Sequence, residues 1–286
     1  MPAYISLSNG VRVFYRASGA PDAPVLLLLH GFPSSSYQYR NMIPTLATKH
    51  RVIAPDLPGF GFTATANDYS HSFANMASTI QLFLDALNVT KYAVYVFDYG
   101  APIAWRIALQ RPDAITAIVS QNGSAYAEGL GRHFWAPFRA YWADPSSTEK
   151  RRAIVPAALT FEATKWQYEN GEPEAETRVD PASYHLDWAL LSRPGNLDVQ
   201  LDLFRDYGDN VGLYPQVHQY FRDSQVPLLA LWGKNDLIFV PEGAEAFKRD
   251  LPDAEVEFLD AGHFAADTHA EEIAGRVLRF LEEKGI

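Results

Sequence analysis

The sequence predicts an α/β fold, with a mostly parallel sheet, helices on both of its faces and a helical segment inserted between two strands. Three observations carry this prediction. Short apolar runs alternate with stretches of helical periodicity, and polar or glycine-rich residues follow the runs. From residue 124 to 222 convincing strand runs are absent while helical spacing continues. We therefore expect a core of residues 1–123 and 223–286 and a helical lid of residues 124–222.

The predicted strands and helices of the core follow from local patterns. Alternating apolar residues on both sides of Asn9-Gly10 predict a β-hairpin. Continuous apolar runs indicate strands buried on both faces of a parallel sheet. We place these strands at residues 25–29, 51–54, 92–97, 115–120, 226–232 and 254–259, and helices at residues 34–49, 73–87, 103–109, 244–251 and 271–282.

The lid is rich in Trp, Tyr, Phe, Pro and Arg. Proline removes a backbone donor and disrupts helix interiors, so its spacing predicts several short helices in this segment. The prolines concerned are Pro137, Pro145, Pro156, Pro173, Pro181 and Pro194.

Composition narrows the classes of function. The 286 residues carry a net charge of -10, which argues against nucleic acid or an anionic membrane as a partner. There is no Cys, so disulfides, thiolate nucleophiles and Cys-based metal sites are excluded. The N-terminal residues lack a signal-peptide pattern and no apolar run approaches membrane-spanning length, so we expect a cytoplasmic protein. We expect no cofactor and no metal, and the sequence does not predict the oligomeric state.

Asp98 is the residue around which the chemistry is organised. It stands between the strand at residues 92–97 and a helical stretch, with Gly100 two residues later. This is the strand–bend–helix pattern of a nucleophile elbow, with Asp in place of the familiar Ser. A carboxylate is ionised near neutral pH, and its attack on a saturated carbon with a good leaving group gives a stable ester. An epoxide or an alkyl halide fits this chemistry, although this stretch alone leaves open that Asp98 merely caps the helix.

Four predicted strand ends carry polar signals: His30-Gly31-Phe32, Asp98, Asp236 and His263. Ligands of parallel α/β sheets bind at the carboxyl ends of the strands, so these groups are expected along one edge. Their convergence favours a catalytic Asp98 over a helix cap. The chain order nucleophile, acid, histidine is that of the α/β-hydrolases.

Several motifs together carry a resemblance to the α/β-hydrolase superfamily, within its aspartate-nucleophile branch of epoxide hydrolases and haloalkane and haloacid dehalogenases. They are His30-Gly-Phe-Pro33, Asp56-Leu-Pro-Gly-Phe-Gly61, Val96-Phe-Asp98-Tyr-Gly100, Trp232-Gly-Lys-Asn-Asp236 and Gly262-His263. The resemblance and the chemistry imply that Asp98 is the nucleophile, His263 the base that activates water and Asp236 its acidic partner. The backbone N–H groups of Phe32 and Tyr99 would form the oxyanion hole.

The lid is expected to supply the leaving-group site. Epoxide opening needs a proton donor, and Tyr141 and Tyr207 lie at offsets that resemble the lid tyrosines of epoxide hydrolases. The pair Tyr141-Trp142 also resembles the halide-site pair of haloacid dehalogenases, where His precedes Trp. Tyr at position 141 therefore favours the epoxide.

We expect a small-molecule hydrolase that converts an epoxide and water to a vicinal diol through an ester on Asp98. A haloalkane or haloacid dehalogenase is the alternative. A catalytically silent hydrolase fold that binds a small molecule is a further alternative, against which the three residues Asp98, Asp236 and His263 count.

Overall fold

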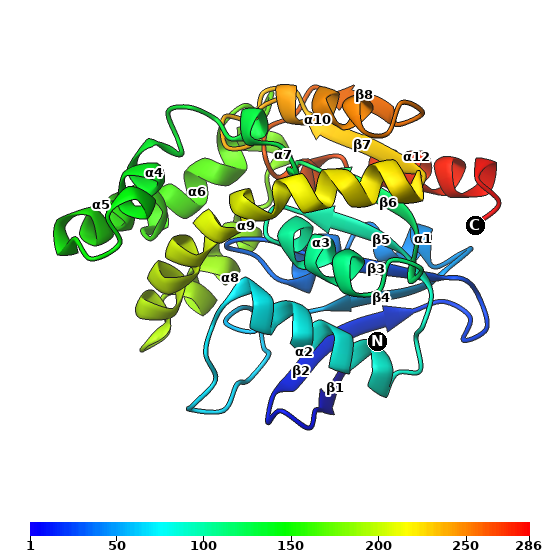
Figure 1. The fold of residues 1–286 in the computed structure, drawn as a ribbon, viewed down its shortest axis with the longest axis horizontal. Helices are drawn as coiled ribbons and strands as arrows, with labels where there is room; N and C mark the ends of the chain where they lie inside the picture. The colour runs from blue at the N-terminus through cyan, green and yellow to red at the C-terminus, as the bar shows by residue number, and fades with distance from the viewer.

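The computed structural model describes residues 1–286 and contains one eight-stranded sheet. The strand order is β1-β2-β4-β3-β5-β6-β7-β8, and only the pairs β1–β2 and β2–β4 are antiparallel (Figure 1). The mostly parallel α/β sheet predicted from the sequence is thus confirmed. The strands are β1 (Pro2–Ser6), β2 (Arg12–Ser18), β3 (Val25–Leu29), β4 (Arg51–Pro55), β5 (Tyr92–Phe97), β6 (Ile115–Gln121), β7 (Leu228–Gly233) and β8 (Glu255–Leu259).

The predicted hairpin joins β1 and β2, with Tyr4 opposite Phe14 and Gly10 at a φ of 78° in the turn. A positive φ suits glycine, which has no side chain to clash with its own carbonyl. The side chain of Asn9 accepts a hydrogen bond from the backbone of Val11 at 3.3 Å. The hairpin supplies the antiparallel edge of the sheet.

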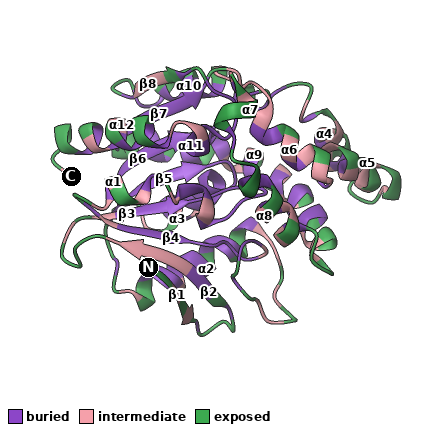
Figure 2. Cartoon of the chain, turned by 180° about the vertical axis from the view of Figure 1, so that it is seen from behind, coloured by how far each residue is buried: buried purple, intermediate pink, exposed green.

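Helices cover both faces of the sheet. Helices α2 (Phe73–Ala86), α3 (Gly100–Gln110) and part of α9 (Asn196–Ser224) lie in front of it in Figure 1. Helices α1 (Ile43–Leu46), α11 (Ala265–Thr268) and α12 (Ala270–Glu283) cover the opposite face, seen in Figure 2. Because strand side chains alternate between faces, the core divides into two clusters of buried residues.

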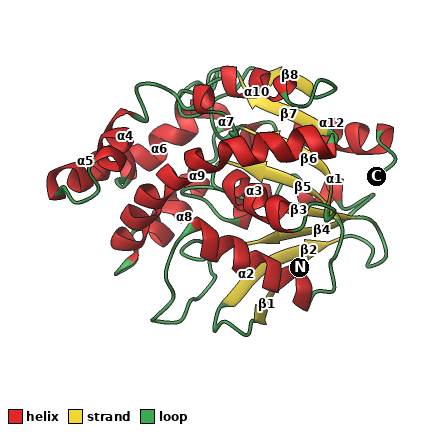
Figure 3. Ribbon diagram, in the orientation of Figure 1, coloured by secondary structure: helices red, strands yellow, loops and turns green.

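The chain between β6 and β7 contains helices and no strand (Figure 3). Most of these helices stand at the carboxyl ends of the parallel strands, whereas the last part of α9 runs back across the front of the sheet (Figure 1). Besides α9 they are η2 (Ala127–Gly129), α4 (Ala136–Ala143), α5 (Thr148–Ala158), α6 (Phe161–Glu169), α7 (Ala175–Arg178) and α8 (Pro181–Leu191). We keep residues 124–222 as the proposed lid.

Two helices predicted for the core are each divided in two in the structure. The segment 34–49 forms a short 3-10 helix, η1 (Ser36–Tyr39), and then α1, because Asp56 binds the backbone N–H of Ser36 at 2.8 Å and Pro44 lies in the first turn of the second helix. The segment 244–251 forms α10 (Glu242–Ala246) and η3 (Phe247–Arg249).

The prediction of only short lid helices is wrong for α9, which has 29 residues and contains Pro215. Ten of its side chains are buried, so tertiary packing outweighs the missing N–H of that proline. Pro156 likewise lies inside α5, near its last turn, and does not break it.

A separate property concerns membranes. No helix combines the length and the apolar character that crossing a bilayer requires.

Candidate active site

Asp98 lies at the bend between β5 and α3 and has a φ of 46°, in the left-handed region that side chains rarely adopt. Such strain, of order 1–3 kcal/mol, persists where surrounding structure enforces it and is common at functional sites. The bend is tight because α3 packs closely on β3: a Cβ at Gly100 would lie 2.1 Å from the carbonyl oxygen of Leu29. The sequence pattern strand, Asp, helix is therefore a true elbow here.

Two backbone N–H groups bind one oxygen of the Asp98 carboxylate. Phe32 donates to Oδ1 at 2.6 Å and Tyr99 donates to the same atom at 2.5 Å. No protein donor binds the second oxygen, Oδ2. The carboxylate is thus oriented with one oxygen held and the other free.

The electrostatic environment of Asp98 raises its pKa to about 6. Burial is the main cause, because the side chain is only 4% exposed and loses the hydration of its charge. The charge of His263 and the N–H groups of Phe32 and Tyr99 act in the opposite direction and lower the pKa. At neutral pH Asp98 therefore remains mostly ionised and able to act as a nucleophile.

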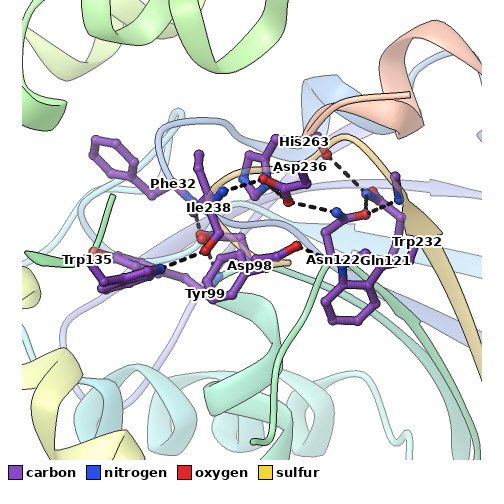
Figure 4. A network of polar contacts seen from close by, with 12 residues as sticks. Phe32, Asp98, Tyr99, Gln121, Asn122, Trp135, Trp232, Asp236, Ile238 and His263 are labelled. Carbon is purple, nitrogen blue, oxygen red and sulfur yellow. Dashed lines mark hydrogen bonds and ion pairs between the residues drawn. The ribbon is translucent and has the colours of Figure 1, made fainter. Parts of the chain in front are cut away.

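His263 and Asp236 form a buried pair, each 2% exposed. The imidazole Nδ1 lies 2.7 Å from Asp236 Oδ2. Figure 4 marks this contact with a dashed line. Since a carboxylate accepts, this contact assigns the proton to Nδ1 and leaves Nε2 with a lone pair. Nε2 is buried and has no hydrogen-bond partner in the protein, and the ring packs on Phe97, the residue before Asp98, with centroids 4.6 Å apart.

Asn122 is a site residue whose role was not predicted from the sequence. It follows β6, and its side-chain amide donates to Asp236 Oδ2 at 2.7 Å while accepting from the backbone N–H of Gly233 at 2.9 Å (Figure 4). The backbone N–H of Ile238 binds the other oxygen of Asp236 at 2.7 Å. Asp236 is thereby oriented toward His263. The sequence feature that could have identified Asn122 is its position at the end of a predicted parallel strand, next to Gly123.

Tyr207, on α9, is the lid tyrosine that the structure brings near Asp98. Its ring centroid lies 5.6 Å from that of Tyr99 and its side chain is fully buried. Burial, then the neighbouring Tyr214 and the Asp98 carboxylate, raise the pKa of its hydroxyl well above the usual value. The hydroxyl therefore keeps its proton and is a donor at every physiological pH.

Tyr141 and Trp142, on α4, direct their polar groups elsewhere. The hydroxyl of Tyr141 accepts from Arg151 of α5 at 3.3 Å, and the indole N–H of Trp142 donates to the backbone carbonyl of Phe204 at 2.7 Å. The indole of Trp135, also near the site, donates to the backbone carbonyl of Ile238 at 2.8 Å (Figure 4). Of the three predicted leaving-group residues, the structure places only Tyr207 beside the Asp98 elbow.

Aromatic side chains close the site. Phe204 of α9 contacts Phe32 with centroids 4.9 Å apart and Phe138 of α4 at 4.7 Å. A surface hollow of about 690 Å³ is lined by Trp142 and by residues of α9, and neither Asp98 nor His263 lines it. Phe32, Phe138 and Phe204 thus form an aromatic wall beside the Asp98 elbow.

Known proteins are similar to this chain in sequence and in fold. A family model described as the alpha/beta hydrolase fold matches residues 24–270. An uncharacterized hydrolase of Saccharomyces cerevisiae is 46% identical over 98% of this chain and 96% of its own length. Epoxide hydrolase 4 of Mus musculus is 27% identical over 96% and 78%, respectively. The crystal structure of a haloalkane dehalogenase loop variant from Bradyrhizobium elkanii superposes with a TM-score of 0.82 at 21% identity, covering 100% of this chain and 97% of that one.

Proposed function

The chain belongs to the α/β-hydrolase fold family and is a hydrolase of that superfamily, and we propose that it opens an epoxide with water to give a vicinal diol. The observation that carries the proposal is the asymmetry of the Asp98 carboxylate. Oδ1 already lies between two N–H donors, whereas Oδ2 has none. The free oxygen can bond to carbon while the held oxygen becomes the carbonyl of the resulting ester.

In the first step Oδ2 of Asp98 attacks a ring carbon of the epoxide, and the bond from that carbon to the ring oxygen breaks. The electron pair moves to the leaving oxygen, which takes a proton from the Tyr207 hydroxyl. The position of Tyr207 beside Tyr99 supports this role. The product of the step is a hydroxyalkyl ester on Asp98.

In the second step Nε2 of His263 removes a proton from water, and the hydroxide attacks the ester carbon of Asp98. Negative charge develops on Oδ1, where the N–H groups of Phe32 and Tyr99 stabilise it. The bond between the carboxyl carbon and Oδ2 then breaks, and the imidazolium protonates the departing oxygen of the diol. Asp236 stabilises the imidazolium meanwhile. The hydroxyl proton left on the Asp98 carboxyl group returns to the Tyr207 oxygen, which restores the carboxylate and the phenol.

The surroundings of Asp98 support an epoxide over a halide. A halide leaving group needs a cradle of N–H or O–H dipoles, but the indoles of Trp135 and Trp142 are bound to backbone carbonyls. The charged groups that shift the pKa of Asp98 are His263 and Asp236, and no arginine or lysine is among them. A carboxylate-bearing haloacid would therefore lack a counter-charge at this centre, whereas a neutral epoxide needs none.

The decisive experiment is intact-mass measurement of the His263→Gln protein after incubation with styrene oxide or with a bromoalkane. Ester hydrolysis should stall, so an adduct on Asp98 should accumulate with the mass of the whole epoxide. An adduct that lacks the halogen would identify a dehalogenase instead. The Asp98→Asn protein is the matched control and should remain unmodified.

Isotope labelling tests the ester itself. In a single turnover of the wild type in H₂¹⁸O, the label should enter Asp98, because the diol leaves with the former Oδ2. A label found in the diol under these conditions would mean direct attack by water, and the ester mechanism would be wrong.

A further inference from the structure

Asp187, on lid helix α8, carries a carboxyl group buried without a cation. It is 1% exposed and forms no ion pair. The hydroxyl of Tyr168, on α6, donates to its Oδ2 at 2.5 Å. The hydroxyls of Tyr168 and Ser34 both lower the pKa of Asp187. A charge held in this way would be solvated only by neutral dipoles, which is costly in a protein interior.

This carboxyl group stands where the lid meets two loops of the active site. Ser34 follows Phe32, which supplies one N–H of the oxyanion hole, by two residues. The ring of Tyr168 stacks on Phe264, with centroids 3.8 Å apart and an interplanar angle of 11°. Phe264 directly follows His263. Asp187 is thus linked through Tyr168 to the segment that carries His263, and the Ser34 hydroxyl that acts on its pKa belongs to the segment that carries Phe32.

The charged groups around Asp187 oppose its ionisation. Asp267, on α11, and Asp56, in the loop after β4, are both anionic and raise the pKa of Asp187. Arg40 is engaged elsewhere, since it pairs with Asp267 at 2.6 Å and with Asp180 at 3.2 Å. Burial is the largest cause, and together these effects raise the pKa of Asp187 to about 8. The carboxyl group is therefore mostly uncharged at neutral pH.

We propose that Asp187 is a positioning residue whose buried carboxyl group, through Tyr168, fastens lid helices α6 and α8 to the active-site loops of His263 and Phe32. Ser183, one helical turn earlier on α8, makes a parallel attachment by donating to Asp267 at 3.0 Å. The attachment through Ser183 involves the charged pair of Arg40 and Asp267. The attachment through Asp187 depends instead on protonation of its own carboxyl group. Only the kinetic consequence of this proposal rests on the proposed function.

The pH dependence has a definite sign. In a detached or unfolded lid Asp187 ionises at its ordinary pKa of about 4, whereas in the attached lid it stays protonated up to about pH 8. The stabilisation is fully present below about pH 4. Between these two pH values the equilibrium constant for attachment falls about tenfold per pH unit, because the attached state binds the additional proton. Above about pH 8 the constant no longer changes.

Asp187→Asn is the matched variant, since the amide has nearly the same shape and does not titrate. We compare its unfolding equilibrium in urea with that of the wild type at pH 5, 6.5 and 8, and measure amide hydrogen exchange of α6 and α8 at each pH. From pH 5 to pH 8 the unfolding constant of the wild type should rise relative to that of the variant by up to about 10³-fold. Glu162→Gln, an exposed acid-to-amide change on α6, should follow the wild type at every pH.

Parallel pH curves for the wild type and Asp187→Asn would overturn the proposal. If the variant does not fold, Tyr168→Phe provides the second measurement, because loss of its hydroxyl should increase exchange in α8 as well as in α6. Unchanged exchange in α8 would contradict a shared attachment. These readouts need no substrate, so they remain valid whatever adduct Asp98 forms.

The kinetic readout follows from the position of Asp187 near the two active-site loops. With an epoxide substrate, kcat of Asp187→Asn relative to the wild type should rise as the pH increases from 6 to 8.5. An equal loss of kcat at every pH would indicate a merely structural role and would count against the proposal. Absence of any turnover with an epoxide would instead refute the proposed function and leave the attachment to be judged from stability and exchange.

Discussion

Gly31 leaves empty the space that the carboxylate of Asp98 occupies. A Cβ at Gly31 would lie 2.2 Å from Oδ1 of Asp98 and 2.3 Å from its Cβ, closer than any real side-chain contact. The two residues come from the ends of β3 and β5, which are adjacent parallel strands. This close approach allows the next residue, Phe32, to aim its N–H at Oδ1.

Gly31→Ala should therefore displace the Asp98 carboxylate or the N–H of Phe32, and kcat should fall by about 10²–10³-fold, the usual effect of losing one oxyanion-hole donor. Steady-state kinetics with an epoxide measures the loss. Gly212→Ala is the matched control, because a Cβ there meets nothing within 4 Å. It should leave kcat unchanged and stabilise α9 by about 0.5–1 kcal/mol. Full activity of Gly31→Ala would contradict the described geometry.

The pH dependence of ester formation should report the ionisation of Asp98. Since the nucleophile must be a carboxylate and its pKa is raised to about 6, kcat/KM should be constant above that value and fall about tenfold per pH unit below it. In His263→Gln the rate of adduct formation should also fall as the pH is lowered, but the fall should begin at a higher pH, because the charge of His263 lowers the pKa of Asp98. If the rate falls only near pH 4 in both proteins, burial does not raise the pKa of Asp98.

Asp236→Asn should separate the two chemical steps. The variant loses the charge that stabilises protonated His263, so ester hydrolysis should slow by roughly 10³–10⁴-fold while attack by Asp98 continues. Intact-mass measurement during turnover should reveal the accumulated ester. Asp260→Asn, an exposed change in the loop before His263, should behave as the wild type. Equal slowing of adduct formation and hydrolysis would assign Asp236 a role in both steps.

Tyr207→Phe should slow epoxide opening by about 10²–10⁴-fold, the usual contribution of a general acid. The matched variant Tyr141→Phe should retain most of the activity, since its hydroxyl binds Arg151. Single-turnover measurement of ester formation distinguishes the two. A large loss in Tyr141→Phe with full activity in Tyr207→Phe would reverse the assignment of the proton donor.

Local patterns predicted most of the core. The apolar runs at residues 25–29 and 92–97 coincide with β3 and β5, and the turn at Asn9-Gly10 joins β1 and β2. These elements depend on residues close together in the chain, so periodicity and turn chemistry suffice. The helix predicted at residues 34–49 is divided in two because Asp56, from a later loop, binds the backbone of Ser36. A contact of that kind leaves no local signal.

The same distinction holds for the candidate site. Sequence alone selected Asp98, Asp236 and His263, because the ends of parallel strands meet at one edge of a sheet. It did not select Asn122 as the partner of Asp236, nor Asp187, because both depend on contacts between segments far apart in the chain.

By itself the sequence determined the α/β class, the order of the strands and helices along the chain and the chemical type of the residues at each strand end. Tertiary structure alone decided that Tyr207 packs beside Tyr99 at the Asp98 elbow while the hydroxyl of Tyr141 binds Arg151, and that Asp187 is buried without a cation. The physical reason is that backbone conformation responds largely to neighbouring residues. The direction of a hydroxyl and the charge of a carboxyl group depend on the groups that packing brings around them.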